Sequence, residues 1–238
     1  MKIQIIGSGS SGNCFRVDDG QTALLLECGL PIQKIKAGCG YNLSGIAGCC
    51  VSHEHGDHAK AVNDLMKSGV DVYMTEGTAR ACNAQTYRLK LWHRDGTDKI
   101  GLPFYHTERI GTFAVKPFAV HHDAAEPVNY LIESKATNER LLFVTDTQYI
   151  DYRFSGLTHI MAEANFSDDA LAEPENAPRR HRLRRTHMSL EHCIELLKAN
   201  DLSQIQEIWL IHLSQSNGNA EEFKYRVQEA TGCEVHIA

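Results

Sequence analysis

Residues 51–60, VSHEHGDHAK, place three histidines, a glutamate and an aspartate within six consecutive positions. They follow a short apolar run that predicts a buried strand. His53 and His55 lie two residues apart, so in an extended segment both side chains project to the same side. Asp57 and His58 follow at the entry to a predicted helix. Imidazole and carboxylate groups that converge in this way suit zinc, manganese or iron.

Two simpler explanations of this cluster need no metal. A solvated loop can hold such a mixture by chance, and helices often carry acidic residues in their first turn. Neither explanation requires three histidines. Gly56 is expected to let the backbone turn sharply before the helix predicted at residues 59–67. The cluster therefore favours a metal site.

Length and composition place the chain among globular proteins. We expect one domain, residues 1–238, which is long enough to bury a large core. No apolar run reaches the roughly 18–20 residues that a membrane span needs, and the first residues are too weakly apolar for a signal peptide. The eight cysteines include no C-x-x-C pair, which favours reduced thiols in a cytoplasmic protein. The net charge of -6 argues against a general nucleic-acid coat.

Periodicity and turn residues predict alternating strands and helices. The predicted strands cover residues 3–6, 14–17, 22–26, 46–51, 70–74, 113–120, 128–133, 141–145, 159–162, 207–213 and 233–237. The predicted helices cover residues 59–67, 75–82, 190–199 and 220–231. The polar and basic stretch 167–186 is expected to form a long surface loop. Two successive sets of strands and helices indicate a layered α/β sandwich.

Further candidate ligands lie where predicted strands end. They are the His121-His122-Asp123 run, Asp146 and His212. Each is a weak signal by itself, because a strand-end histidine is usually a structural residue and a strand-end aspartate usually forms a turn or a cap. Together with the cluster at residues 53–58, they supply the ligands that a second metal would need.

The order of these residues along the chain resembles the metallo-β-lactamase superfamily of dinuclear metallohydrolases. The H-x-H-x-D-H motif comes first, followed by a strand-end His, a strand-end Asp and a final His. Four further motifs are similar to those of a branch of small bacterial and phage hydrolases. They are GSGSSGNC from residue 7, HDAAEP from residue 122, VTDT from residue 144 and IHLS from residue 211. That branch resembles the ribonuclease Z side of the superfamily, which cleaves phosphodiesters. The resemblance implies an αβ/βα four-layer sandwich with metals at the strand mouths.

The resemblance also implies a ligand set for two divalent metal ions, with zinc expected first and manganese as the alternative. His53, His55 and His122 would hold the first ion. Asp57, His58 and His212 would hold the second, Asp146 would bridge the two, and Asp57 is also expected to act in catalysis. His122 is chosen over His121 because it matches the HDAAEP motif, since strand alternation alone does not decide between them.

Two glutamates are candidates to orient these ligands. Much of the superfamily has an aspartate at the end of an early strand, where this chain has Glu27 in LLLECG. Glu is one methylene longer and can still accept hydrogen bonds from the loop or from a ligand imidazole. Glu163, at the end of a later strand, is a second candidate, with a strand-end cap as the alternative. A charge that faces water is the alternative for Glu27.

Two bound metals would leave the site with about one net positive charge, which favours an anionic substrate such as a phosphodiester, and a metal-bridging hydroxide would attack it. His187 precedes a predicted helix, as does a proton-donating histidine of the ribonuclease Z branch. A histidine can protonate a leaving group at neutral pH. A structural histidine at a helix start is the equally weighted alternative.

One dense basic run directly precedes His187. Its arginines can grip phosphate oxygens, because the guanidinium fork matches phosphate geometry, or they can form an ordinary solvated surface. Three aromatic residues after the expected bridging aspartate, Tyr149, Tyr152 and Phe154, are candidates to stack on bases, although aromatic residues there are more often core. The arginines of the run are Arg179, Arg180, Arg182, Arg184 and Arg185.

The sequence therefore predicts a metal-dependent phosphodiesterase, most simply a nuclease acting on DNA or RNA. A hydrolase of a small ester, thioester or cyclic nucleotide is the alternative within enzymes. A metal-stabilised binding protein without turnover is the alternative outside enzymes. No membrane partner is expected, and the sequence does not indicate an oligomeric state.

Overall fold

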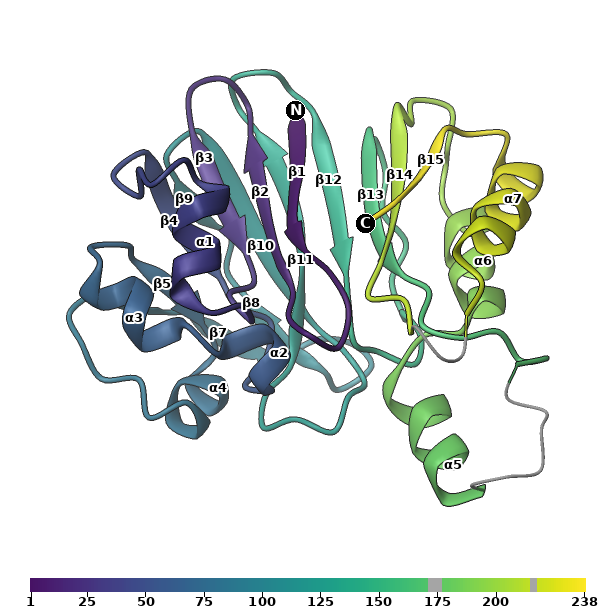
Figure 1. Cartoon of the computed structure of the whole chain (residues 1–238), viewed down its shortest axis with the longest axis horizontal. Helices are drawn as coiled ribbons and strands as arrows, with labels where there is room; N and C mark the ends of the chain where they lie inside the picture. Colours follow the sequence, from purple (N-terminus) through teal and green to yellow (C-terminus); the bar gives the residue numbers. More distant parts are fainter. Residues whose placement is uncertain (171–176, 215–217) are drawn as a thin grey trace. The chain divides into compact units, whose positions relative to one another are not determined.

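The computed structural model describes residues 1–170, 177–214 and 218–238, and at residues 177–180 it describes the backbone alone. The chain groups into two compact units. The N-terminal unit comprises Met1–Ala119 and Ala124–Asn138, and the C-terminal unit comprises Val120–Asp123 and Glu139–Ala238. Figure 1 traces the elements of both units in chain order.

The N-terminal unit contains a six-stranded sheet whose strands lie in chain order. The first three strands pair antiparallel, and the last four pair in parallel. All four residues of β3 are buried, as expected of a strand that is covered on both faces. The strands are β1 (Lys2–Gly7), β2 (Cys14–Asp18), β3 (Ala23–Leu26), β4 (Ile46–Cys50), β5 (Val72–Met74) and β6 (Leu89–Leu91).

Apolar side chains of the helices in this unit pack against the sheet. Ile35, Leu65 and Met66 share one buried cluster with Leu25 and Val72 of the strands. The burial of this apolar surface is the main force that holds the helices on the sheet. The helices are α1 (Ile32–Gly38), α2 (Gly56–Ala59), α3 (Val62–Lys67) and α4 (Glu76–Ala81).

The remaining strands of the N-terminal unit are antiparallel. The longest two pair along their whole length, from Phe113 opposite Ser134 to Ala119 opposite Val128. Two shorter strands pair with the first strand of this hairpin, and a third pairs with one of those two. The strands are β7 (Arg94–Thr97), β8 (Pro103–Tyr105), β9 (Glu108–Ile110), β10 (Phe113–Ala119) and β11 (Val128–Ser134).

The single helix predicted at residues 59–67 is wrong, because the structure has two short helices, α2 and α3, with a break at residues 60–61. A continuous helix would bond the backbone N–H of Ala61 to the carbonyl of Asp57. That carbonyl instead accepts from Asn13, and the Ala61 N–H donates to the carbonyl of Cys28. Contacts from the strand ends thus interrupt the helix.

The C-terminal unit is built on a parallel sheet in the order β12 (Arg140–Val144), β13 (His159–Glu163), β14 (Glu207–Ile211) and β15 (Val235–Ile237). Every residue of β13 is buried, as expected of a central strand in a parallel sheet. Because the strands are parallel, the residues that follow β12, β13 and β14 emerge at one edge of the sheet. Ligands of open α/β sheets characteristically bind at this edge.

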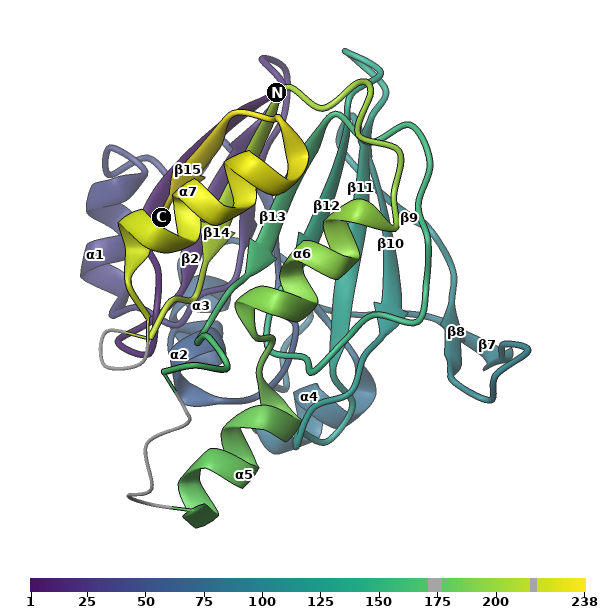
Figure 2. The ribbon, with the colours of Figure 1, turned by 90° about the vertical axis from the view of Figure 1, so that its right-hand side faces the viewer.

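Two helices cover one face of this sheet, as Figure 2 shows. α6 (Leu190–Lys198) and α7 (Ala220–Thr231) bury apolar side chains at helical spacing, with Cys193 and Leu197 on α6 and Phe223 and Val227 on α7. The side chain of Ser189 caps α6 by accepting a hydrogen bond from the backbone N–H of His192.

The long loop predicted at residues 167–186 is wrong for its second half, because residues Ala177–Thr186 form α5. This stretch contains no glycine, and Pro178 lies in the first turn, where proline is tolerated. Arginine, leucine and alanine are strong helix formers, so local propensity outweighs the polar composition. The other predicted elements are confirmed to within two residues at each end, whereas α1 and β6–β9 were not predicted.

Within the described parts of the chain, the structure contains no helix that combines the length and the apolar character needed to span a membrane.

Candidate metal centre

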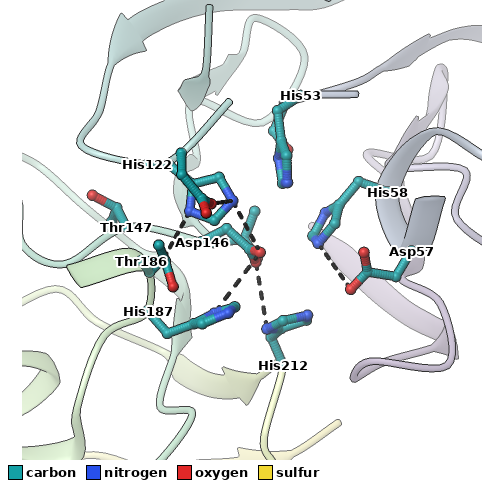
Figure 3. Close-up of polar contacts among 12 residues, drawn as sticks. His53, Asp57, His58, His122, Asp146, Thr147, Thr186, His187 and His212 are labelled. Atoms are coloured by element: carbon teal, nitrogen blue, oxygen red, sulfur yellow. Dashed lines mark hydrogen bonds and ion pairs between the residues drawn. The ribbon is translucent and has the colours of Figure 1, made fainter. Parts of the chain in front are cut away.

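The histidine cluster of the N-terminal unit forms a compact group of rings after β4. The ring centroids of His53 and His55 lie 4.6 Å apart, and those of His53 and His58 lie 4.3 Å apart. His53 and His58 are buried, while His55 and Asp57 are partly exposed. Asp57 lies beside His58, with 3.6 Å between carboxylate oxygen Oδ2 and ring nitrogen Nε2 (Figure 3). The structure therefore brings the four predicted ligands of this unit together.

The backbone of this loop is fixed by the ends of neighbouring strands. The carbonyl of Asp57 accepts from the backbone N–H of Asn13 at 2.8 Å and from its side-chain amide at 3.2 Å. The backbone N–H of Cys28 donates to the carbonyl of His58 at 2.8 Å. A Cβ atom at Gly29 would lie 1.7 Å from the Asp57 carbonyl oxygen, so only glycine permits this approach.

Gly56 is not the constrained glycine of this loop. Its φ lies outside the left-handed region, and a Cβ atom there would meet nothing within 4 Å. The chain does turn from extended backbone at His55 into a helix at Gly56, but the conformation there does not require glycine, whereas the close approach at Gly29 does.

Glu27 is fully buried beneath the cluster. Its carboxylate accepts from the backbone N–H of Ser52 at 3.2 and 3.3 Å and lies 3.5 Å from Nδ1 of His58. Burial raises the pKa of Glu27, and its contacts with His58 and Ser52 offset only part of this effect. Glu27 has a φ of 64°, a backbone conformation that residues other than Gly, Asn and Asp rarely adopt. The tertiary contacts must hold this residue in place.

Four ionisable side chains of the C-terminal unit gather at the carboxyl edge of its parallel sheet. One ligand atom from each of Asp146, Glu163, His187 and His212 lies within 4.8 Å of the others. Asp146 follows β12, Glu163 ends β13 and His212 follows β14, so parallel register explains how they meet. Asp146, Glu163 and His212 are buried, and His187 is partly exposed. Figure 3 shows the His187 and His212 rings on either side of the Asp146 carboxylate.

Hydrogen bonds indicate which ring nitrogen of His122 and His212 carries the proton. Nδ1 of His122 contacts the carbonyl of Thr186 at 2.8 Å, and a carbonyl only accepts, so this nitrogen carries the proton. Nδ1 of His212 contacts Oε1 of Glu163 at 2.9 Å. In both residues Nε2 is then the nitrogen that could bind a metal. A ligand histidine characteristically donates its other N–H to a carboxylate or carbonyl in this way.

Glu163 also contacts His187, with 2.7 Å between Oε1 and Nδ1. Burial by itself acts to raise the pKa of Glu163, but the adjacent His187 and the hydrogen bonds to both histidines bring it below its ordinary value. The pKa of His187 moves the opposite way: burial acts to lower it, and Glu163 and Asp146 raise it above its ordinary value. Glu163 thus acts as a shared acceptor rather than as a strand-end cap.

Two residues of this cluster have strained backbone conformations. Asp146 has a φ of 40° and His212 a φ of 54°. The carbonyl of His212 accepts from the side-chain amide of Asn165 at 2.8 Å, which holds the turn after β14. Strain of this kind costs of order 1–3 kcal/mol per residue and is concentrated at functional sites.

The neighbouring histidines 121 and 122 face different surroundings. The side chain of His122 is 1% exposed, and its ring nitrogen Nε2 lies 3.7 Å from Oδ2 of Asp146. His121 instead pairs with Asp151 and stacks on Tyr149. The structure therefore turns His122, and not His121, toward the Asp146 cluster.

The predicted arginine grip is only partly described. Arg182, Arg184 and Arg185 are exposed on α5, whereas the side chains of Arg179 and Arg180 lie outside the described residues. Arg182 pairs with Asp123 at 3.3 Å and Arg184 with Asp168 at 3.5 Å.

Sequence reasoning did not assign a supporting role to Ser52 or to the Thr186 carbonyl. Ser52 binds Nδ1 of His53 through its hydroxyl at 2.8 Å, which leaves Nε2 of that ring to coordinate. A serine before a histidine and a backbone carbonyl leave no distinctive sequence pattern. In each unit a histidine Nε2 lies beside a carboxylate, that of His58 beside Asp57 and that of His122 beside Asp146. Imidazole and carboxylate donors of this kind fit divalent zinc or manganese.

Comparisons with known proteins agree with this chemistry. A family model described as a beta-lactamase superfamily domain matches residues 29–213. The exodeoxyribonuclease WalJ of Streptococcus pneumoniae serotype 2 is 29% identical over 231 residues, which cover 92% of this chain and 84% of that protein. The metallo-β-lactamase fold protein YhfI of Bacillus subtilis superposes with a TM-score of 0.75 at 17% identity, covering 99% of this chain and 95% of that one. The short form of human tRNase Z superposes with a TM-score of 0.61 at 15% identity, covering 100% and 96%.

The fold and these matches define a metal-dependent hydrolase with the metallo-β-lactamase fold. The chain belongs to the beta-lactamase superfamily. The predicted fold class and the predicted hydrolase activity are thereby confirmed.

Proposed function

We propose that this chain is a nuclease that hydrolyses phosphodiester bonds of DNA with two divalent metal ions. The observation that carries the proposal is the group of four side chains at the carboxyl edge of the parallel sheet, Asp146, Glu163, His187 and His212. Buried carboxylates beside imidazoles are donor types that suit a divalent metal ion, and the family is one of metal-dependent hydrolases. The similarity to a protein named an exodeoxyribonuclease supports DNA as the substrate.

The proposed ligand set is the one that the resemblance to the superfamily implies. His53, His55 and His122 would hold one ion, Asp57, His58 and His212 would hold the other, and Asp146 would serve both. Zinc is the expected metal, with manganese as the alternative. Two such ions, when bound, supply an activated water and stabilise negative charge on the phosphate oxygens.

Hydrogen bonds from other residues of the chain orient these proposed ligands. Thr186 fixes the tautomer of His122, and Glu163 does the same for His212. Glu27 supports the histidine loop through Ser52 and His58. Rings that are held in this way lose little freedom when they bind a metal or a substrate, which favours both steps.

His187 is the proposed proton donor to the leaving oxygen. Its Nδ1 is held by Glu163, so Nε2 is the nitrogen that can deliver a proton. The partly exposed ring lies beside the metal-binding cluster and remains accessible to a substrate. A proton donor matters most when the leaving group is a poor one, such as the sugar hydroxyl of DNA.

The first experiment measures hydrolysis of bis-p-nitrophenyl phosphate and of single-stranded and duplex DNA with zinc, manganese or magnesium. We expect metal-dependent turnover of both substrate types and its loss in Asp146→Ala. The absence of metal-dependent phosphodiester hydrolysis in every condition would refute the proposal. Turnover of RNA in preference to DNA would correct the substrate and leave the reaction class intact.

The second experiment tests His187 with His187→Gln. We expect the turnover of DNA to fall by about 10²–10⁴-fold, the usual worth of a general acid. Hydrolysis of bis-p-nitrophenyl phosphate should fall far less, because p-nitrophenolate departs without protonation. Equal losses on both substrates would show that His187 does not act as the acid. His236→Gln, on β15, is the matched control.

A cytoplasmic location is part of the same proposal. All eight cysteines lie in described parts of the chain and none forms a disulfide. Unpaired thiols are typical of a reducing compartment. Fractionation of the host cell followed by detection of the protein tests this location.

A further inference from the structure

A cleft of about 510 Å³ opens on the C-terminal unit beside the proposed metal ligand His122. This volume lies within the range of small-ligand sites in proteins. Three segments supply its walls: the residues after β10, the residues after β12 and the exposed face of α5. The lining residues are His121, His122, Asp123, Gln148, Tyr149, His181, Arg182, Arg185 and Thr186.

One wall of the cleft is aromatic. The rings of His121 and Tyr149 stack with centroids 4.6 Å apart and an angle of 26° between their planes. Nε2 of His121 lies 2.6 Å from Oδ2 of Asp151, and its backbone N–H donates to the hydroxyl of Thr147 at 3.2 Å. The pair is thus held in place while 36% of the His121 side chain and 42% of Tyr149 remain exposed.

The opposite wall is cationic. Arg185 follows Arg182 by three residues and His181 by four on α5, so its side chain lies on the same side of the helix as each of them. Arg182 is paired with Asp123 at 3.3 Å. Arg184 does not line the cleft and pairs with Asp168. The cleft therefore combines stacked rings with guanidinium groups, beside His122.

We propose that this cleft binds one unpaired nucleotide of a single-stranded nucleic acid, with its base against the His121–Tyr149 pair and its phosphate near Arg182 and Arg185. Exposed aromatic rings and a basic wall are the two features with which proteins bind single strands, because every base has a face that can stack. In a duplex the bases already stack on each other, so a paired nucleotide cannot use the platform. The inference rests on the proposed nuclease function and assigns it a single-stranded substrate.

The test measures binding of metal-loaded protein to two short fluorescent probes of equal length by fluorescence anisotropy. One is a phosphorothioate-linked oligothymidylate, which resists hydrolysis, and the other has the same backbone without bases. We expect the wild-type protein to bind the base-bearing probe about tenfold or more tightly than the abasic probe. In Tyr149→Ala the ratio of the two dissociation constants should fall close to one. Tyr149→Phe should keep the wild-type ratio.

Matched variants separate the cleft from general surface effects. Tyr225→Ala removes an exposed tyrosine from α7 and should retain the base preference. Arg185→Ala should weaken binding of both probes and make it less dependent on salt, because a phosphate contact releases counterions. Arg184→Ala removes the same charge from the same helix outside the cleft and should have the smaller effect.

Two outcomes distinguish this inference from the function on which it rests. If wild-type protein hydrolyses bis-p-nitrophenyl phosphate but Tyr149→Ala keeps the full base preference, the cleft assignment is overturned and the nuclease proposal stands. If no phosphodiester is hydrolysed, the nuclease proposal fails whatever the probes show. Tighter binding of duplex than of single-stranded probe would also overturn the inference.

Discussion

At the residue scale, the single buried carboxylate of Glu163 positions several neighbouring groups. It ends β13 with no exposed surface, and one oxygen contacts both His187 and His212. Its second oxygen accepts from the backbone N–H of Met188 at 3.1 Å. The same carboxylate therefore positions two rings and the chain that enters α6. A substitution here should affect ring orientation before it affects the fold.

We expect Glu163→Gln to lower metal affinity by about 10- to 100-fold, the usual cost of losing a hydrogen-bonded partner of a ligand histidine. The amide retains the shape of the side chain but not its charge. Competition with a fluorescent chelator measures this affinity. Glu229→Gln, at an exposed position of α7, is the control and should leave it unchanged. Unaltered metal affinity in Glu163→Gln would contradict the orienting role.

Gly29 carries a different constraint at the same scale. We expect Gly29→Ala to lower the free energy of unfolding by about 3 kcal/mol or more, because its Cβ would overlap the backbone of Asp57 at 1.7 Å. The displaced loop should also bind less metal. Thermal unfolding and metal analysis measure the two effects. Gly45→Ala, where a Cβ meets nothing within 4 Å, should change the free energy of unfolding by no more than about 0.5 kcal/mol.

At the scale of elements, the turn between β2 and β3 is tied to the β10–β11 hairpin. Asp19 accepts from the hydroxyls of Thr112 at 2.6 Å and Ser134 at 2.7 Å, and from the backbone N–H of Thr22 at 2.8 Å. Burial acts to raise the pKa of Asp19, but these hydrogen bonds to the charged form bring it from 3.8 to about 2. One carboxylate thus joins strands far apart in the sequence.

Asp19→Asn should therefore destabilise the protein in a pH-dependent way. A lowered pKa in the folded protein means that the carboxylate stabilises the fold above about pH 4 and that this contribution is lost as the pH falls toward about 2. We expect the variant to lose about 1–3 kcal/mol at neutral pH. Urea unfolding at pH 7 and pH 3 measures the difference from wild type. A difference that does not shrink at the lower pH would contradict this account.

At the scale of the whole molecule, the proposed metal ligands follow strand ends that are brought into place only in the folded chain. Metal binding then stabilises only folded chains, so metal binding and folding are coupled. A ligand present at 100 times its Kd adds about 2.7 kcal/mol to the free energy of unfolding. The metal is therefore expected to be a structural as well as a chemical component.

Removal of metal by a chelator should lower the Tm, and added zinc or manganese should restore it. Asp146→Ala should show a much smaller shift, because the variant lacks a proposed ligand. Differential scanning fluorimetry and metal analysis by mass spectrometry measure the two quantities. A Tm that does not respond to chelator, in protein shown to have contained metal, would refute the coupling.

Local patterns predicted most elements because burial and propensity acted in the same direction there. Residues 220–231 have helical spacing and form α7 over the same range. The prediction failed where other contacts decided, as at Ala61, whose N–H bonds Cys28 and ends the helix. It also failed at α5, where polar composition was taken as a sign of a loop. Short strands such as β7 and β8 have too little apolar pattern to be recognised.

The sequence by itself determined the donor types and their places at strand ends, because the H-x-H-x-D-H order and the apolar runs are local properties. Tertiary structure decided which of two adjacent histidines turns toward Asp146, and it gave Glu163 its two ring partners. It also placed the Thr186 carbonyl on His122 and brought Asp57 against Gly29. These outcomes depend on residues tens of positions apart in the chain, whose contacts form only when the strands and helices pack.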